Sequence, residues 1–345
     1  MNGKQWQRRQ ILFLLSGAIG SLALHSCNSS TSSSNGASEP TSTEASLAIV
    51  TWIGYTPLYI AQEKGFYKEA GLDLKMQVFG SNVEANAAFR AGRTDAITLV
   101  PSETLTLAAT DKAFRVVYVV DLSSGGDGIL ARNKITDIAA FKGQKIAVEQ
   151  GAVSHFFLLQ AMTEAGLTEQ DVTLVNLAPD AAASAYQAGQ VDIAVSYAPF
   201  LFTANSEQKD GRIIYDSSKL KYPTALSDLI LFDEAFIEQN PQAIEAFIRG
   251  NLKALEFLNS NRAEGLEIAA KQLGLTASEL DEQLKSIKLP NLAENVEMLS
   301  DPNSDLYLLK PMADLTQFLQ SQGKIQQAPD LDRLLEPKFV KAIAS

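Results

Sequence analysis

The chain has 345 residues, of which 46% are hydrophobic and 20% charged, a balance that indicates a folded globular protein long enough for two domains. Its formal net charge is −11, which excludes the basic surface that nucleic-acid binding requires. A single cysteine (Cys27) excludes an intramolecular disulfide, and only two histidines (His25 and His155) exclude most histidine-rich metal sites.

The first 26 residues have the features of an export signal. Cations precede an apolar run over residues 11–24, which is shorter than the about 20 residues that span a bilayer. The run ends in Leu24-His25-Ser26-Cys27, which resembles a bacterial lipobox, although His25 stands where that pattern has a small residue. We predict a lipoprotein signal peptide over residues 1–26 and lipidation of Cys27. An ordinary signal peptide with an incidental cysteine is the alternative.

Residues 27–45 are rich in serine and threonine and lack hydrophobic periodicity, which predicts a flexible tether. Beyond them, short Val/Ile-rich runs alternate with helical patterns, which predicts an α/β fold of mostly parallel sheets flanked by helices. Strand-like runs begin at Leu47, Leu74, Ala96, Val116, Ile129, Lys145, Thr173, Ile193, Ile213 and Leu229. Helical patterns cover residues 57–70, 154–165 and 181–188, and a helical tail is expected at 241–258, 263–273, 277–287 and 306–322.

An internal repeat organises these elements into two halves. The segment Ala88–Asp95 matches Ala185–Asp192, 97 positions later, and the same offset pairs Gly54 with Gly151. In both copies a glycine ends a helix, where the left-handed conformation is common, and an aspartate then enters a strand. Duplication and chance similarity of two helix-to-strand turns both remain open. We predict a first lobe formed by residues 46–122 plus 218–345 and a second lobe formed by residues 123–217.

The segment GYTPLYIAQEKGFYKEAGL, residues 54–72, resembles the opening of the solute-binding proteins of ABC importers for nitrate, taurine, alkanesulfonates and thiamine precursors. Ala91-Gly92-x-x-Asp95 and the turn at residues 195–200 are similar to the same family. The resemblance implies a two-lobed periplasmic binding fold of type II, which closes around one ligand. It also implies a binding protein rather than an enzyme, with no cofactor.

The candidate pocket residues follow the predicted strands, because open α/β sheets bind ligands beyond the carboxyl ends of their strands. Helix N-termini meet there and offer free N–H groups to an anion or a polar ligand. The candidates are Trp52, Gly54, Tyr55, Ser81, Asn82, Ser102, Glu103, Thr104, Ser124, Asp127, Gly151, Ser154, His155, Tyr197 and Asp228.

Each candidate type has a structural alternative. Trp52 can pack in the core, and the serines and threonines at helix starts can act as caps alone. The stretch containing Ser124 and Asp127 can be a hinge, His155 can be a packed residue, and Asp228 can pair with a neighbour. The aromatic and acidic candidates favour an organic solute with an amine or a ring over a bare inorganic anion.

We therefore expect a monomeric substrate-binding lipoprotein in the periplasm or on the cell surface, held to the membrane by its lipid anchor alone. Its partners would be a small solute (a sulfonate, taurine, nitrate or a thiamine pyrimidine) and the permease and ATPase of an ABC importer, with no nucleic acid. Two alternatives are an enzyme related to thiamine-pyrimidine synthases and a ligand sensor without a transport role.

Overall fold

The computed structural model describes residues 42–345. The predicted signal peptide, Cys27 and most of the predicted tether lie outside the described residues. The predicted boundary between tether and fold at residue 45 is wrong, because strand β1 already begins at Thr43 rather than near Leu47. The Thr43 amide donates a hydrogen bond to the Gly71 carbonyl, so residues 43–45 are part of a sheet.

Six strands form the first sheet, in the order β11-β4-β10-β3-β1-β2. β2, β1 and β3 run parallel, whereas β10 is antiparallel to both β3 and β4, and β11 is antiparallel to β4. The strands are β1 (Thr43–Ile49), β2 (Leu72–Val78), β3 (Ala96–Leu99), β4 (Phe114–Ser123), β10 (Ser227–Asp233) and β11 (Ile287–Lys288).

Five strands form the second sheet, in the order β7-β6-β8-β5-β9. β7, β6 and β8 run parallel, and β5 is antiparallel to its neighbours β8 and β9. The strands are β5 (Asp127–Arg132), β6 (Lys145–Val148), β7 (Thr173–Asn176), β8 (Ile193–Tyr197) and β9 (Gly211–Asp216). The chain thus passes from the first sheet to the second after Ser123 and returns between Asp216 and Ser227. The predicted lobe boundaries stay a prediction.

The two sheets share one strand arrangement. The order β2-β1-β3-β10 in the first sheet corresponds to β7-β6-β8-β5 in the second, with three parallel strands followed by one antiparallel strand in each. Helix α3 (Asn82–Arg90) and helix α6 (Pro179–Gln187) start and end 97 positions apart. Gly92 and Gly189 follow them with φ of 67° and 75°, a left-handed conformation that glycine adopts without strain. The repeat in the sequence therefore has a structural counterpart.

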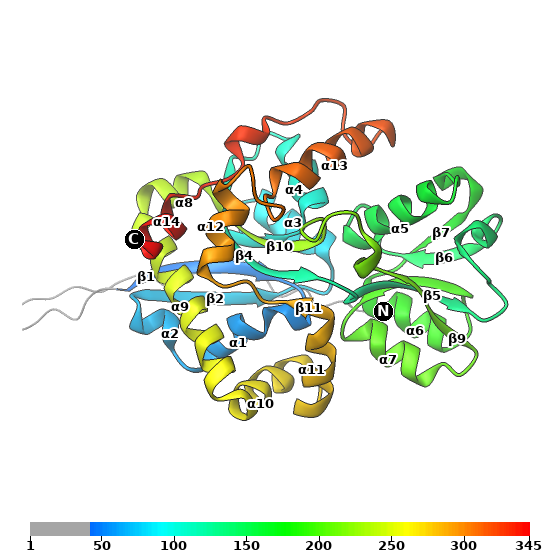
Figure 1. Cartoon of the computed structure of the whole chain (residues 1–345), viewed down its shortest axis with the longest axis horizontal. Helices are drawn as coiled ribbons and strands as arrows, with labels where there is room; N and C mark the ends of the chain where they lie inside the picture. Colours follow the sequence, from blue (N-terminus) through cyan, green and yellow to red (C-terminus); the bar gives the residue numbers. More distant parts are fainter. Residues whose placement is uncertain (1–41) are drawn as a thin grey trace, which may run out of the picture. The chain divides into compact units, whose positions relative to one another are not determined.

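Helices cover both faces of each sheet (Figure 1). In the second sheet, alternate side chains point to opposite faces. Leu130, Ala147 and Ala194 pack with α6 and α7 (Phe200–Glu207) in one buried cluster. The neighbouring strand positions belong to the larger core that includes α5 (Val153–Glu164). Figure 1 accordingly shows α5 on one side of this sheet and α6 and α7 on the other.

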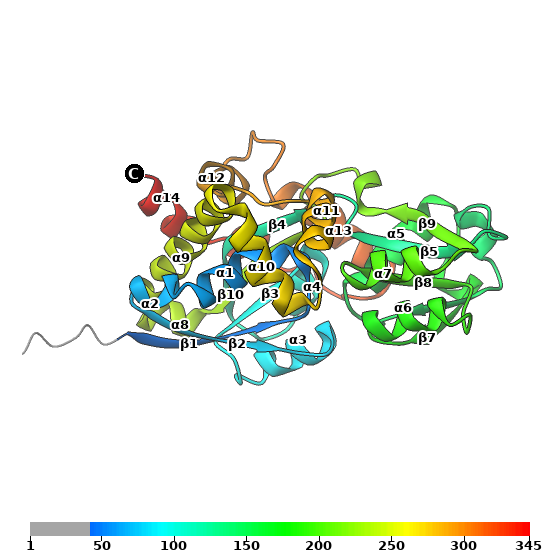
Figure 2. The ribbon, with the colours of Figure 1, turned by 90° about the horizontal axis from the view of Figure 1, so that it is seen from below.

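The first sheet has two helical layers. Helices α1, α2, α9 and α10 contact one another, and Figure 2 shows α1 and α10 in front of the strands when the molecule is seen from below. α4 and α13 pack together and lie on the upper side in Figure 1. The remaining bounds are α1 (Thr56–Glu63), α2 (Phe66–Glu69), α4 (Pro101–Ala108), α8 (Glu234–Gln239), α9 (Pro241–Ser260), α10 (Arg262–Leu273), α11 (Ala277–Gln283), α12 (Leu292–Ser300), α13 (Leu309–Ser321) and α14 (Lys338–Ala344).

Two predicted helices differ in the structure. The helix expected over residues 57–70 is divided into α1 and α2 at Gly65, which has a φ of 73°. The helix expected over residues 277–287 ends early, and Ile287 begins β11. Within residues 42–345, no helix combines the length and the apolar character needed to cross a membrane.

Candidate functional site

A narrow cavity lies beyond the carboxyl ends of the parallel strands, and elements of both sheets line it. The first sheet and its connections contribute most of the wall. Asp127 of β5, Val153 of α5 and Tyr197 of β8 come from the second sheet and its helices. The full lining is Val50, Trp52, Tyr55, Asn82, Val100, Glu103, Asp127, Val153, Tyr197, Leu226 and Asp228.

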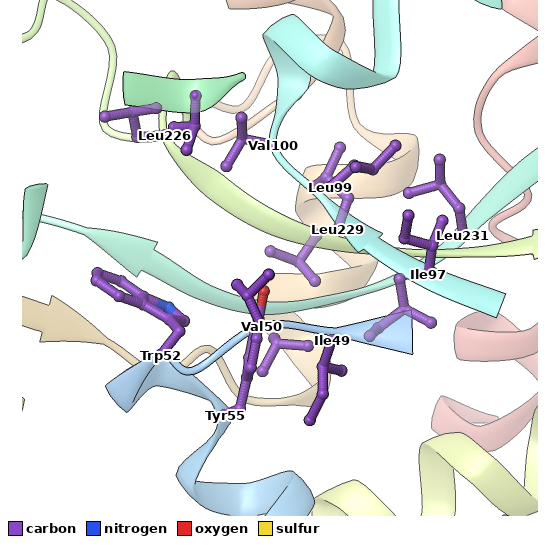
Figure 3. Packing of buried hydrophobic residues seen from close by; sticks show 14 of the residues in the cluster. Ile49, Val50, Trp52, Tyr55, Ile97, Leu99, Val100, Leu226, Leu229 and Leu231 are labelled. Atoms are coloured by element: carbon purple, nitrogen blue, oxygen red, sulfur yellow. The ribbon is translucent and has the colours of Figure 1, made fainter. Parts of the chain in front are cut away.

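Aromatic rings form part of the wall. Trp52 and Tyr55 follow β1, and Figure 3 shows them with Val50 on one side of an apolar cluster that has Val100 and Leu226 on the other. The ring of Tyr197 meets Trp52 edge to face, with centroids 5.7 Å apart. This geometry is favourable for aromatic pairs, so the contact helps to hold the two sides of the cavity together.

Three carboxyl groups line the cavity, and burial raises the pKa of each. The pKa of Glu103 rises to about 8, that of Asp127 to about 7 and that of Asp228 to about 6. Desolvation is the first cause in all three, and the charge of Glu149 adds to the effect at Glu103. The Tyr55 hydroxyl donates a hydrogen bond of 2.6 Å to Asp228 and works against its rise.

A fourth carboxyl group, Asp121 of β4, is fully buried behind the cavity wall. Its Oδ2 accepts a hydrogen bond of 3.0 Å from the Trp52 indole, while its Oδ1 has no hydrogen-bond partner among the described residues. Burial and the neighbouring charge of Asp228 raise its pKa well above the ordinary value. Gly54 makes room for this pair, because a Cβ at Gly54 would lie 2.0 Å from Asp121 Oδ2.

Two further carboxyl contacts join elements of the two sheets. Glu149, just after β6, accepts hydrogen bonds from the Val83 amide (3.0 Å) and the Asn82 side chain (3.4 Å) at the start of α3. Glu103, in the first turn of α4, accepts one from the Val153 amide (3.2 Å) at the start of α5. Each carboxyl group therefore satisfies a free N–H of a helix that covers the other sheet.

The structure brings seven of the predicted candidates together in the cavity lining: Trp52, Tyr55, Asn82, Glu103, Asp127, Tyr197 and Asp228. The other eight do not line it: Gly54, Ser81, Ser102, Thr104, Ser124, Gly151, Ser154 and His155. Ser81 caps α3 by accepting a hydrogen bond from Glu84. Ser124 lines a separate hollow beside Ser286.

His155 is buried away from the cavity. Its Nδ1 accepts a hydrogen bond from the Gly151 amide, and its Nε2 lies 3.5 Å from a carboxylate oxygen of Glu169. Burial and the charge of Lys324 lower the pKa of His155. These contacts indicate that His155 contributes to the packing around α5.

Sequence reasoning did not single out Glu149, Asp121 or the apolar lining residues Val50, Val100, Val153 and Leu226. Glu149 could have been found, because it is a carboxylate directly after a buried strand at the edge where ligands bind. The apolar residues carry no such signal, since they resemble any core residue in the sequence.

Comparison with known proteins identifies the family. The sequence profile described as NMT1/THI5 like matches residues 52–264. The chain is 24% identical to the taurine-binding periplasmic protein of Escherichia coli (strain K12) over 294 residues, which cover 83% of this chain and 89% of the relative.

Solved structures show the same fold at low identity. The alkanesulfonate-binding protein SsuA from Xanthomonas axonopodis pv. citri, bound to MOPS, matches with a TM-score of 0.69 and 17% identity, covering 86% of this chain and 99% of its own. The desulfurization enzyme DSZB matches with a TM-score of 0.60 and 17% identity, covering 87% and 98%. The predicted two-lobed periplasmic binding fold is thus confirmed, and the fold occurs in binding proteins and in an enzyme. The chain belongs to the NMT1/THI5-like family.

Proposed function

We propose that the protein is an extracytoplasmic solute-binding lipoprotein that captures one small organic solute and delivers it to an ABC importer. The observation that carries this proposal is the cavity itself, whose wall is built from both sheets at their carboxyl ends. A solute there contacts both sets of elements at once, so its binding stabilises the arrangement in which they are close. The permease would recognise that arrangement.

The contacts across the cavity support this mechanism. Trp52 meets Tyr197, Asn82 donates a hydrogen bond of 3.2 Å to the Tyr197 hydroxyl, and Glu103 meets the start of α5. In every case one partner belongs to the first sheet and its helices and the other to the second. We propose Trp52, Tyr55, Asn82, Glu103, Asp127, Tyr197 and Asp228 as the residues that contact the solute.

We also propose binding without turnover. The taurine-binding relative supports this role, whereas the likeness to a desulfurization enzyme concerns the fold alone. Incubation of the purified full-length chain with a bound solute, followed by mass spectrometry of that solute, tests this point. A recovered solute of unchanged mass supports binding without turnover, and a product formed in proportion to protein contradicts it.

A thermal-shift screen of the full chain tests the binding function. The panel contains taurine, alkanesulfonates, nitrate, an aminomethylpyrimidine and simple amines. A solute at 100 times its dissociation constant stabilises the folded state by about 2.7 kcal/mol, which shifts the melting temperature measurably. The absence of a shift with every member of the panel would contradict the proposal.

The lipid anchor has a separate test. We expect the mature chain to begin at Cys27 and to remain in the membrane fraction of the cell that makes it. A Cys27→Ala variant should lose the anchor. Mass spectrometry of the N-terminal peptide gives the result, and an unmodified cysteine in the membrane fraction would contradict lipidation.

A further inference from the structure

The cavity wall includes the starts of four helices, which are the usual places for an anion in a fold of this kind. Tyr55 and Val100 directly precede α1 and α4. Asn82 at the start of α3 and Val153 at the start of α5 both line the cavity. The amide of Val83 already donates to Glu149, and the amide of Val153 already donates to Glu103. The protein's own carboxyl groups therefore occupy one amide at each of the α3 and α5 starts, which a sulfonate or a nitrate ion could otherwise use.

The side chains of the wall add no positive charge. Its polar groups are two tyrosines, the Trp52 indole, the Asn82 amide and three carboxyl groups, and none of the described lining residues is a lysine, arginine or histidine. Asp127 is 7% exposed and lines this cavity. Directly behind the wall, Asp121 is fully buried and its Oδ1 has no hydrogen-bond partner among the described residues. Within residues 42–345, these buried carboxyl groups thus have no lysine, arginine or histidine beside them in the cavity lining.

Resting on the proposed solute-binding function, we infer that the solute is a cation, with an ammonium group or a protonated ring nitrogen held between Asp127, Asp228 and Glu103. The aromatic faces of Trp52 and Tyr197 fit the same chemistry, because an aromatic face attracts a cation. A solute whose only charged group is a sulfonate would meet three carboxyl groups, and the Val83 and Val153 amides would already be bonded.

Binding of a cation is coupled to proton release. The raised pKa values of Glu103 and Asp127 keep part of these groups protonated at neutral pH. A bound cation favours their ionised forms, so affinity rises with pH between about 6 and 8. For each proton released on binding, the affinity for the cation rises by a factor of up to about ten per pH unit. The titratable groups that face one another here are Tyr55, Glu103, Asp121, Asp127, Glu149, Tyr197 and Asp228.

Matched solutes test the charge preference without any variant. Phenylmethanamine, phenylmethanol and phenylmethanesulfonate share one carbon skeleton and differ in charge, and propylamine, propanol and propanesulfonate form a smaller set. Titration calorimetry of the full chain measures the affinity of each. We expect the amine of a set to bind at least about tenfold more tightly than its sulfonate. Calorimetry in two buffers of different ionisation enthalpy should show release of protons on amine binding.

Two variants test whether Asp127 and Asp228 hold the cation. Asp127→Asn and Asp228→Asn each remove a charge at nearly constant shape, and each should weaken amine binding by about tenfold or more. Asp111→Asn is the matched control, because Asp111 is exposed and outside the cavity. Circular dichroism and thermal melting show whether each variant is folded.

The outcomes separate this inference from the proposed function. If a sulfonate binds as tightly as its amine partner, the solute-binding function stands and the cation inference is overturned. Amine binding that is unaffected by pH and by both aspartate substitutions overturns it as well. If the chain binds no solute of either set and none of the thermal-shift panel, the proposed function fails and the inference fails with it.

Discussion

The Glu103 carboxyl group accepts a hydrogen bond from the backbone amide of Val153, 50 positions further along the chain. Glu103 belongs to a helix that covers the first sheet, and Val153 begins a helix that covers the second. Glu149 makes the reverse connection to Val83. The two glutamates therefore cross-link the walls of the cavity in both directions, through groups whose protonation depends on pH.

The protonation of Glu103 should make the stability of the protein depend on pH. Its pKa is about 8 in the folded protein against an ordinary 4.5, so the folded state holds its proton more tightly than the unfolded state. This contribution to stability is complete below about pH 4.5 and is lost as pH rises through about 8. We expect the free energy of unfolding to fall by up to about 1.4 kcal/mol per pH unit within this window.

Urea unfolding at several pH values measures this dependence. In Glu103→Gln the slope should be smaller, because the amide does not titrate. Glu63→Gln is the control, since Glu63 is exposed on α1, and it should keep the slope of the wild type. Equal slopes in the wild type and Glu103→Gln would show that Glu103 does not carry the effect.

The hydrogen bond between Tyr55 and Asp228 should be important for stability. Tyr55→Phe removes the donor that lies 2.6 Å from the carboxyl group and leaves that group buried with less compensation. We expect a loss of about 1–3 kcal/mol in the free energy of unfolding. Tyr118→Phe is a suitable control, because Tyr118 is buried and its hydroxyl makes no hydrogen bond recorded within residues 42–345. A loss of equal size in both variants would contradict a specific role for the pair.

Gly54 should tolerate no side chain. In Gly54→Ala the new Cβ would lie 2.0 Å from Asp121 Oδ2 and 2.3 Å from the Trp52 indole nitrogen, so this buried pair must move. Overpacking of this kind costs about 1–3 kcal/mol. In Gly80→Ala the atom nearest to the new Cβ would be Glu84 Oε2 at 3.6 Å, and we expect little change. Thermal unfolding of the two variants side by side distinguishes the outcomes.

Hydrogen exchange should detect the two glutamate contacts separately. Glu149→Ala removes the acceptor of the Val83 amide, so exchange at Val83 should accelerate by about tenfold or more while Val153 stays protected. Glu103→Ala should produce the opposite pattern, with faster exchange at Val153. Acceleration of both amides in either variant would indicate a general loosening in place of two separate contacts.

Local patterns in the sequence were sufficient to predict most of the strands and several of the helices. Val/Ile-rich runs marked β1 to β10, and the helix expected from residue 277 begins there as α11, behind a capping box of Thr276 and Glu279. The break at Gly65 and the early start of β1 could not be read in this way. The early start of β1 depends on the pairing of Thr43 with Leu72, which is distant in the sequence. The break between α1 and α2 depends on the backbone angle of one residue, Gly65.

The candidate site was predictable to the extent that it lies at strand ends. Seven candidates meet in one cavity because β1, β2, β3 and β8 end on the cavity side of their sheets, where the antiparallel strands β5 and β10 begin. The direction of a side chain was not predictable. His155 turns toward Glu169, and the partner of Glu149 is an amide 66 positions earlier, which no local pattern reveals.

The amides bonded to Glu103 and Glu149 bear on the background of inorganic salts that a solute-binding protein of the proposed kind would meet. Chloride, sulfate or phosphate would find the Val83 and Val153 N–H groups already satisfied by oxygens of the same chain. We therefore expect such salts to be weak competitors for the cavity under the proposed function.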